Sequence, residues 1–336
     1  MITLEDDALH VRAPGVHDRA RCVIAFERTL RIPDDGRDYP LPPGLGSFPL
    51  RHLDDYAARL PAAWRTRGGV ITPMRQAEAL WISFEAGLGA GEPYPFAVKI
   101  GTGKVCAVTG DRWVNHLNSD PQDYVVIPEQ PWLDGYCVEE GIVRQFVAMP
   151  LGDGYTAEEQ LTGAGSHGGL QILAYPMKAE RYRSLPHPKL DGELHAMEAM
   201  GPDMGLAPGG RMRQEIYEDP YDLDTWDQRH PSRCFVSIVN TAQWMAVTGE
   251  VPPGRPFTAE QYTAYGLPWF DYYDGDAEAL EGSARLRGMA SVAQFGRASG
   301  KEPLPENVSA GTGHVVRLGK GEARPVREGA AGEIWA

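Results

Sequence analysis

VEEGIVRQFVAMPLGDGYTAEEQLTGAGSHGGLQILAYPM, residues 138–177, predicts a strand, a turn, a short helix, a glycine loop and a second strand. Apolar and β-branched residues over 142–149 indicate the first strand, which ends at Pro150. Thr156 and Glu159 have the spacing of a capping box, so a helix should begin at Ala157. Four glycines between 163 and 169 then interrupt the chain before the second strand, over 170–175, which Pro176 ends.

The segments on both sides of this unit are short apolar runs separated by turns. Glycine (39 residues) and proline (28 residues) together exceed their usual share of roughly 12%. This composition favours short strands over long helices. FAVKIGTGKVCAVT, residues 96–109, predicts a hairpin that turns at 101–104. The strands that we predict lie at Ala8–Arg12, 22–31, 79–85, 96–100, 105–109, 124–127, 142–147 and 170–175.

Helices are expected mainly in the second half of the chain. The apolar segment 238–247, followed by Gly249, predicts a buried helix with a glycine C-cap. Thr258 and Gln261 repeat the capping-box spacing, which predicts a helix that ends near Gly266. Shorter helices are predicted over 50–60, near 193–200 and over 277–285. The remainder of 177–210 has the composition of a loop, and 315–316 fit an edge strand.

These elements predict a β-rich α+β fold, with a large antiparallel sheet system that is sandwich- or barrel-like. A loop- and helix-rich C-terminal part should pack against it. We expect a β-rich lobe over 1–176, a loop- and helix-rich lobe over 177–296 and an extended tail over 297–336. A single domain that includes all three segments is the alternative.

The charge of the chain argues against two classes of partner. The formal net charge is −14, and such a surface repels phosphate backbones and anionic lipid. Basic residues occur as pairs, such as Arg65 with Arg67, and not as a stripe. We therefore expect neither nucleic acid nor membrane as a partner. An unknown protein or small-molecule ligand is expected instead, and a homo-oligomer is compatible with the sequence.

Several motifs with a known mechanism are absent from the sequence. Residues 101–104 lack the spacing of a phosphate loop, and Val105 stands where Ser or Thr would bind magnesium. In GSHG, residues 165–168, the first glycine is one residue too close to Ser166 for a nucleophile elbow. The sequence also contains no HExxH motif and no dinucleotide fingerprint. We therefore expect no cofactor and no metal ion.

Polar residues that flank the glycine loop form the first candidate site. Glu159 and His167 would act as a general acid–base pair if the loop brought them together, with Arg213 as a third catalytic candidate. Alternatively, Glu159 only closes the capping box and His167 is a solvated loop residue. Glu158 belongs to the same polar group, and Gln160 and Gln171 are candidate ligand-binding residues.

Two further clusters allow a functional and a structural interpretation. Trp269 and Tyr272, in the aromatic segment 268–274, are candidate ligand-binding residues, although such aromatics also fill cores where helices meet a sheet. The acidic run over 215–227 contains oxygen ligands that suit a divalent cation, but it lacks the ligand order of an EF-hand. An acidic surface turn is the alternative, and we assign no metal ligands.

Two hypotheses about function follow from these observations. The first is a soluble cytosolic protein that binds a ligand or assembles with a partner, without catalysis of its own. It is favoured because no nucleophile–base set is visible. The alternative is a cofactor-independent hydrolase or lyase that uses the glycine-loop region with Glu159 and His167.

The four cysteines provide a test of the expected compartment. Each lies in an apolar segment, and their spacings fit neither a zinc site nor a CxxC pair. The first twelve residues, MITLEDDALHVR, contain no apolar segment typical of a signal peptide, which favours a cytoplasmic protein. We predict that alkylation of native protein prepared without reductant, followed by unfolding, yields four free thiols by mass spectrometry. A disulfide would contradict both the redox state and the compartment.

Overall fold

The computed structural model describes residues 1–86, 93–185, 204–252, 254–275, 277–301, 304 and 308–318. Short apolar segments between turns form strands, as the composition predicts, and seventeen of them join in one largely antiparallel sheet. The predicted β-rich α+β fold class is therefore confirmed. No helix in the described parts of the chain is long and apolar enough to span a membrane.

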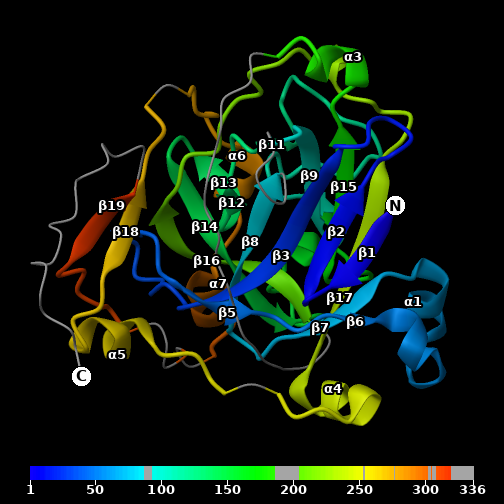
Figure 1. Cartoon of the computed structure of the whole chain (residues 1–336). Coiled ribbons are helices and arrows are strands. Elements are labelled where there is room, and N and C mark those ends of the chain that lie inside the picture. The colour runs from blue at the N-terminus through cyan, green and yellow to red at the C-terminus, as the bar shows by residue number, and fades with distance from the viewer. Residues whose placement is uncertain are drawn as a thin grey trace, which may run out of the picture.

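The sheet consists of two arrays of strands. The first array follows the order β1 (Ile2–Glu5), β2 (Ala8–Arg12), β3 (Arg21–Thr29), β8 (Ala79–Ala86), β14 (Ile142–Pro150) and β16 (Met204–Arg213). Four shorter strands join it: β4 (Asp38–Tyr39), β5 (Gly44–Ser47), β12 (Trp132–Leu133) and β13 (Gly135–Glu139). Figure 1 shows the long strand β3 running through this array.

The second array contains the strands that carry the candidate site. Its order is β11 (Val125–Ile127), β9 (Phe96–Thr102), β15 (Leu170–Pro176), β17 (Ser232–Val239), β7 (Val70–Pro73) and β6 (Arg51–His52). The short strand β10 (Val105–Cys106) folds back on β9 and confirms the predicted hairpin. Within the described chain, one ladder pair joins the two arrays, Met204 with Ile238.

Both arrays contribute to one hydrophobic core. Phe26 and Ile82 come from the first array, Ile100 and Ile172 come from the second, and all four are at most 1% exposed. β15 pairs with β17, so the sheet continues across residue 176. The proposed domain boundaries at 176 and 296 stay predictions.

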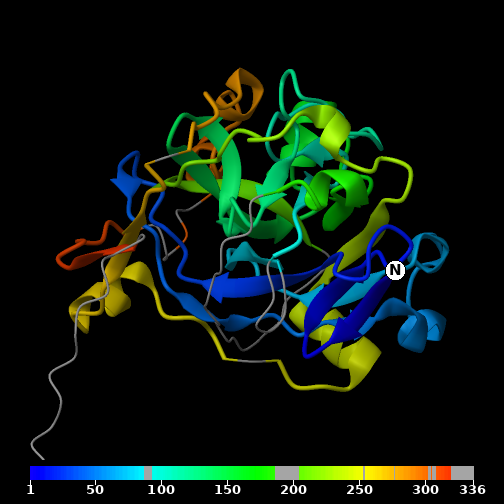
Figure 2. The same ribbon diagram turned by 45° about the horizontal axis from the view of Figure 1, so that its top comes forward.

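The helices are short and lie around the sheet (Figures 1 and 2). The separate parallel pair of β18 (Trp269–Tyr272) and β19 (Val315–Leu318) stands opposite β1 and β2 in both views. The helices are η1 (Leu53–Arg59), α1 (Ala62–Arg67), α2 (Ala157–Thr162), α3 (Ala179–Tyr182), η2 (Leu223–Thr225), α4 (Thr241–Thr248), α5 (Ala259–Ala264), α6 (Ala284–Arg287) and α7 (Val292–Ala298).

Several predicted boundaries were wrong. The apolar run 238–247 contains the end of β17 and then α4, because Asn240 caps the helix and separates the two elements. The helix predicted over 50–60 is the 3₁₀ helix η1, and that over 277–285 is reduced to α6. The strand predicted over 105–109 ends at Cys106. The helix predicted near 193–200 falls outside the described residues.

Strand β16 was missed because its sequence, MGLAPGGRMR, is rich in glycine and proline. Tight packing explains two of these glycines. A Cβ at Gly209 would lie 2.5 Å from Cγ2 of Val147, and one at Gly210 would lie 2.5 Å from the carbonyl oxygen of Pro33. These two glycines, which make the segment look like a loop in the sequence, allow β16 to lie close to the backbone and side chains beside it.

The unit predicted over 138–177 is confirmed as β14, a turn, α2, the glycine loop and β15. Thr156 caps α2, and its hydroxyl accepts a hydrogen bond from the Glu159 backbone N–H at 3.2 Å. The Glu159 carboxylate accepts hydrogen bonds from the backbone N–H groups of Thr156, Gly152 and Gly154. The capping box therefore also orders the turn that precedes the helix.

We predict that Thr156→Ala lowers the free energy of unfolding by about 0.5–2 kcal/mol, because the capping hydrogen bond is lost. Urea denaturation followed by circular dichroism measures the effect. Thr66→Ala, at an exposed position in α1, is the control and should change stability by less than about 0.5 kcal/mol. Equal stability of the two variants would contradict the capping box.

Candidate functional site

A row of residues across β9, β15 and β17 forms the floor of the candidate site. Gly101, Gln171 and Phe235 are cross-strand partners in this row. The alternate residues, such as Ile100 and Ile172, belong to the core. Because side chains alternate between the two faces of a strand, the row faces outward, away from the core.

Glycine shapes one end of this floor. A Cβ at Gly101 would lie 2.5 Å from Cε3 of Trp113, so the indole ring rests directly on the strand backbone. The Trp113 Nε1–H donates to Oδ1 of Asn115 at 3.0 Å, which helps to hold the ring in place. The Gln171 side chain donates to the carbonyl oxygen of Gly103 at 2.6 Å and ties the floor to the β9–β10 turn.

A pocket of about 270 Å³ opens above this row. Five separate parts of the chain contribute to its wall: the end of α1, the β9–β10 turn, the loop at 113–115, the glycine loop and β17. The lining residues are Arg67, Gly103, Lys104, Trp113, Asn115, His167, Gly168, Leu170, Gln171, Arg233 and Phe235. We call this the cationic pocket, because basic side chains and no acidic ones are found among the described residues that line it.

Three of its cations lack a carboxylate partner. Within the described parts of the chain, neither Arg67, Lys104 nor Arg233 forms a salt bridge, and Nε of Arg67 is buried without a hydrogen-bond partner. The two guanidinium groups lie 5.7 and 5.9 Å from the centre of the Phe235 ring. Burial lowers the pKa of Arg67, and the Glu158 carboxylate opposes this effect. The pocket therefore concentrates positive charge.

His167 reaches the pocket from the glycine loop and contacts a buried carboxylate. Its Nδ1 lies 3.1 Å from Oε1 of Glu158, whose side chain is only 3% exposed, whereas that of His167 is 41% exposed. The backbone N–H groups of His167 and Gly168 donate to the other oxygen of Glu158. A Cβ at Gly103 would lie 2.3 Å from that oxygen, so the carboxylate occupies space that only glycine leaves free.

The structure brings only two of the predicted site residues into this pocket, His167 and Gln171. Glu159 is engaged in the capping box, and the acid that contacts His167 is Glu158. Arg213 pairs with Asp271, with its Nη2 2.8 Å from Oδ1, and does not line the pocket. The geometry therefore does not assemble Glu159, His167 and Arg213 as one group.

Two of the remaining predicted residues have structural contacts. Gln160 donates to the carbonyl oxygens of Tyr155 and Ala290 and joins α2 to the segment before α7. Trp269 is fully buried, and its ring packs against Tyr39 and Tyr262. These contacts match the structural alternative for the aromatic segment at Trp269.

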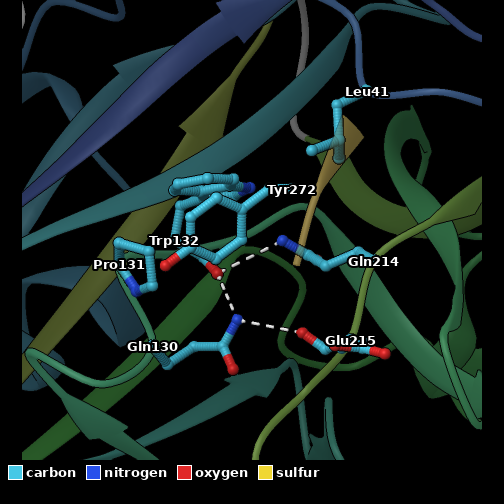
Figure 3. A pocket seen from close by; sticks show the side chains of 7 residues that line it. All are labelled: Leu41, Gln130, Pro131, Trp132, Gln214, Glu215 and Tyr272. Carbon is cyan, nitrogen blue, oxygen red and sulfur yellow. Dashed lines mark hydrogen bonds between the residues drawn. The ribbon is translucent and has the colours of Figure 1, made fainter. Parts of the chain in front are cut away.

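Tyr272 lines a second hollow, which Figure 3 shows from close by. Its ring packs on Trp132 at 4.9 Å between centres, and the Trp132 carbonyl oxygen accepts hydrogen bonds from Gln130 and Gln214. The hollow measures about 10 Å³, the size of a single water molecule. Its two amide side chains, Gln130 and Gln214, bond to backbone groups and to the Asp134 carboxylate, so the hollow offers little to a ligand.

The acidic run over 215–227 is divided among separate partners. Asp219 accepts hydrogen bonds from Tyr124 and Trp226, Asp224 pairs with Arg181, and Asp227 contacts His230. In the described ranges there is no group of three or more His, Cys, Asp or Glu side chains that could hold a metal ion. The run therefore contributes to packing and surface ion pairs.

The lining residues that sequence reasoning missed include Arg67, Lys104, Trp113, Arg233 and Phe235. Arg67 was noted only as one of a pair, and Lys104 only as part of a motif that is not a phosphate loop. No family model, curated protein or solved structure matches the chain.

A buried acid lies beside the hollow of Figure 3. The Asp134 carboxylate accepts a hydrogen bond from Gln214 Nε2 at 2.7 Å, and the side chain is only 3% exposed. Burial raises the pKa of Asp134 from 3.8 to about 7, although hydrogen bonds from Trp132 and Gln214 oppose the shift. The folded protein therefore holds this proton more tightly than the unfolded chain.

We predict that Asp134→Asn becomes more stable relative to the wild type as the pH rises. Between pH 3.8 and about 7, the unfolded chain releases the Asp134 proton and the folded chain keeps it, so the wild type loses stability across this window. The asparagine variant has no such proton. Urea denaturation at pH 4 to 8 measures the difference, with the exposed Asp54→Asn as control. A difference independent of pH for Asp134→Asn would contradict the shift.

Proposed function

We propose that this chain is a ligand-binding protein, and that the cationic pocket takes a small dianion with a flat apolar part. The observation that carries the proposal is the set of three cations, Arg67, Lys104 and Arg233, around one pocket without an acidic partner among the described residues. In a chain of net charge −14, local acids usually neutralise such side chains. A bound anion would complete the charge balance here.

The charge and the size of the pocket narrow the class of ligand. Three cations match a phosphate monoester better than a single carboxylate, and planar guanidinium groups suit its paired oxygens. A volume of about 270 Å³ lies just below the usual range for pockets of drug-sized ligands, which favours a compact molecule. These properties favour a phosphate with one small substituent.

The walls of the pocket favour an aromatic substituent. Trp113 and Phe235 present ring surfaces to the pocket. Gln171 and Asn115 supply amide groups that can orient a polar edge of the ligand. Aromatic rings bind flat apolar groups well, so a phenyl phosphate is a suitable first probe.

We predict that phenyl phosphate binds the protein, and that Arg67→Gln and Arg233→Gln each weaken this binding about 10-fold or more. A hydrogen bond to a charged group contributes about 1.5–3 kcal/mol, which corresponds to this loss. Isothermal titration calorimetry at low and moderate salt measures the affinity, which should fall as salt increases.

Arg65→Gln is the matched control, because Arg65 lies on the same helix but does not line the pocket. Its affinity for phenyl phosphate should equal that of the wild type. Thermal melts without ligand show whether each variant is folded. Absence of binding to the wild type, or an equal loss in the Arg65 control, would contradict the proposal.

A further inference from the structure

We infer that His167 is a nucleophile that takes the phosphoryl group from an aryl phosphate bound in the cationic pocket. This inference rests on the proposed function, because it needs the phosphate in that pocket. It adds chemistry to binding: a covalent phosphohistidine and the release of a phenol. The residues that carry it are His167 and Glu158, with the cations around them.

The contact with Glu158 determines which nitrogen of His167 is available. The Glu158 carboxylate faces three donors: Nδ1 of His167 and the backbone N–H groups of His167 and Gly168. In the neutral imidazole, Nδ1 therefore carries the hydrogen, and Nε2 keeps its lone pair. His167 lines the cationic pocket, so this second nitrogen is the atom that can reach a ligand.

The position of Glu158 follows from the start of α2. Glu159 is held by the capping box, and Glu158, one residue earlier, points toward the β9–β10 turn and the glycine loop. The absence of a side chain at Gly103 leaves space for the carboxylate. Glu158 is therefore a positioning residue, buried in its place before any ligand arrives.

The chemical step conserves atoms and charge. Nε2 of His167 attacks phosphorus with its lone pair, an N–P bond forms, and the P–O bond to the aryl group breaks. The electron pair leaves with the oxygen as a phenolate, which then takes a proton from water. The imidazole becomes cationic while it carries the phosphoryl group, and the Glu158 carboxylate stabilises that charge through Nδ1–H.

Water completes the reaction. A water molecule attacks phosphorus, the N–P bond breaks, and its electron pair returns to Nε2, so that inorganic phosphate and free His167 are formed. Arg67, Arg233 and Lys104 offset the charge of the phosphoryl oxygens in both steps. The net reaction is hydrolysis of an aryl phosphate with water as the co-reactant.

The pocket favours an aryl leaving group over an alkyl one. No carboxylic acid lines its described wall to protonate a poor leaving group. A phenolate leaves without this help, whereas an alkoxide does not. The ring surfaces of Trp113 and Phe235 fit the same aryl group.

The test is a labelling experiment on the full chain with p-nitrophenyl phosphate. We expect release of p-nitrophenol and, after rapid denaturation at alkaline pH, a mass gain of one phosphoryl group that tandem mass spectrometry places on His167. His167→Ala should lose both signals. His52→Ala, which removes an exposed histidine outside the pocket, should keep both.

Glu158→Gln separates positioning from folding. The rate of phosphoryl transfer should fall on the order of 10²-fold or more, because the charge that stabilises the imidazolium is lost. The affinity for inorganic phosphate should stay the same, because Glu158 does not line the pocket. A parallel loss of both would show that Glu158 has only a structural role and would overturn its part in the inference.

The outcomes distinguish this inference from the proposed function. If phenyl phosphate binds but no phosphoryl group appears on His167, the inference fails and the binding function stands. If a phosphoryl group appears on Lys104 or elsewhere, the inference also fails. If phenyl phosphate does not bind at all, the proposed function fails first.

Discussion

Two adjacent carboxylates at the start of α2 bind the chain segments that precede and follow this helix. Glu159 accepts hydrogen bonds from the turn that precedes the helix, and Glu158 accepts them from the glycine loop that follows it. The helix has only six residues and could not be stable alone. Its first turn instead connects the end of β14 to the beginning of β15, and it places His167 at the rim of the cationic pocket.

Positive charge collects in that pocket because the acids around it are engaged elsewhere. Glu158 lies behind His167, bonded to backbone N–H groups, and does not form a salt bridge with Arg67. Two of the cations, Arg67 and Arg233, lie against the ring of Phe235. Rings attract cations without neutralising them, so the charge remains available to an anion.

Glycines shape the site because they have no side chain and leave space for neighbouring groups. Trp113 rests on Gly101, and the Glu158 carboxylate fills the space beside Gly103. At Gly69, at the other end of the floor, a Cβ would lie 2.1 Å from the Phe235 carbonyl oxygen. At each of these glycines a neighbouring group lies so close to the backbone that a side chain would push it away.

The sequence by itself determined the features that depend on neighbours along the chain. Alternation located most strands, and residue spacing located the capping boxes at Thr156 and Thr258, because these contacts join residues only a few positions apart. It also placed His167 and Gln171 among the candidates. The tertiary structure alone decided that β16 is a strand, that Glu158 and not Glu159 meets His167, and that Arg67, Trp113 and Arg233 share one pocket. Those contacts depend on the register between strands distant in sequence, which no local pattern encodes.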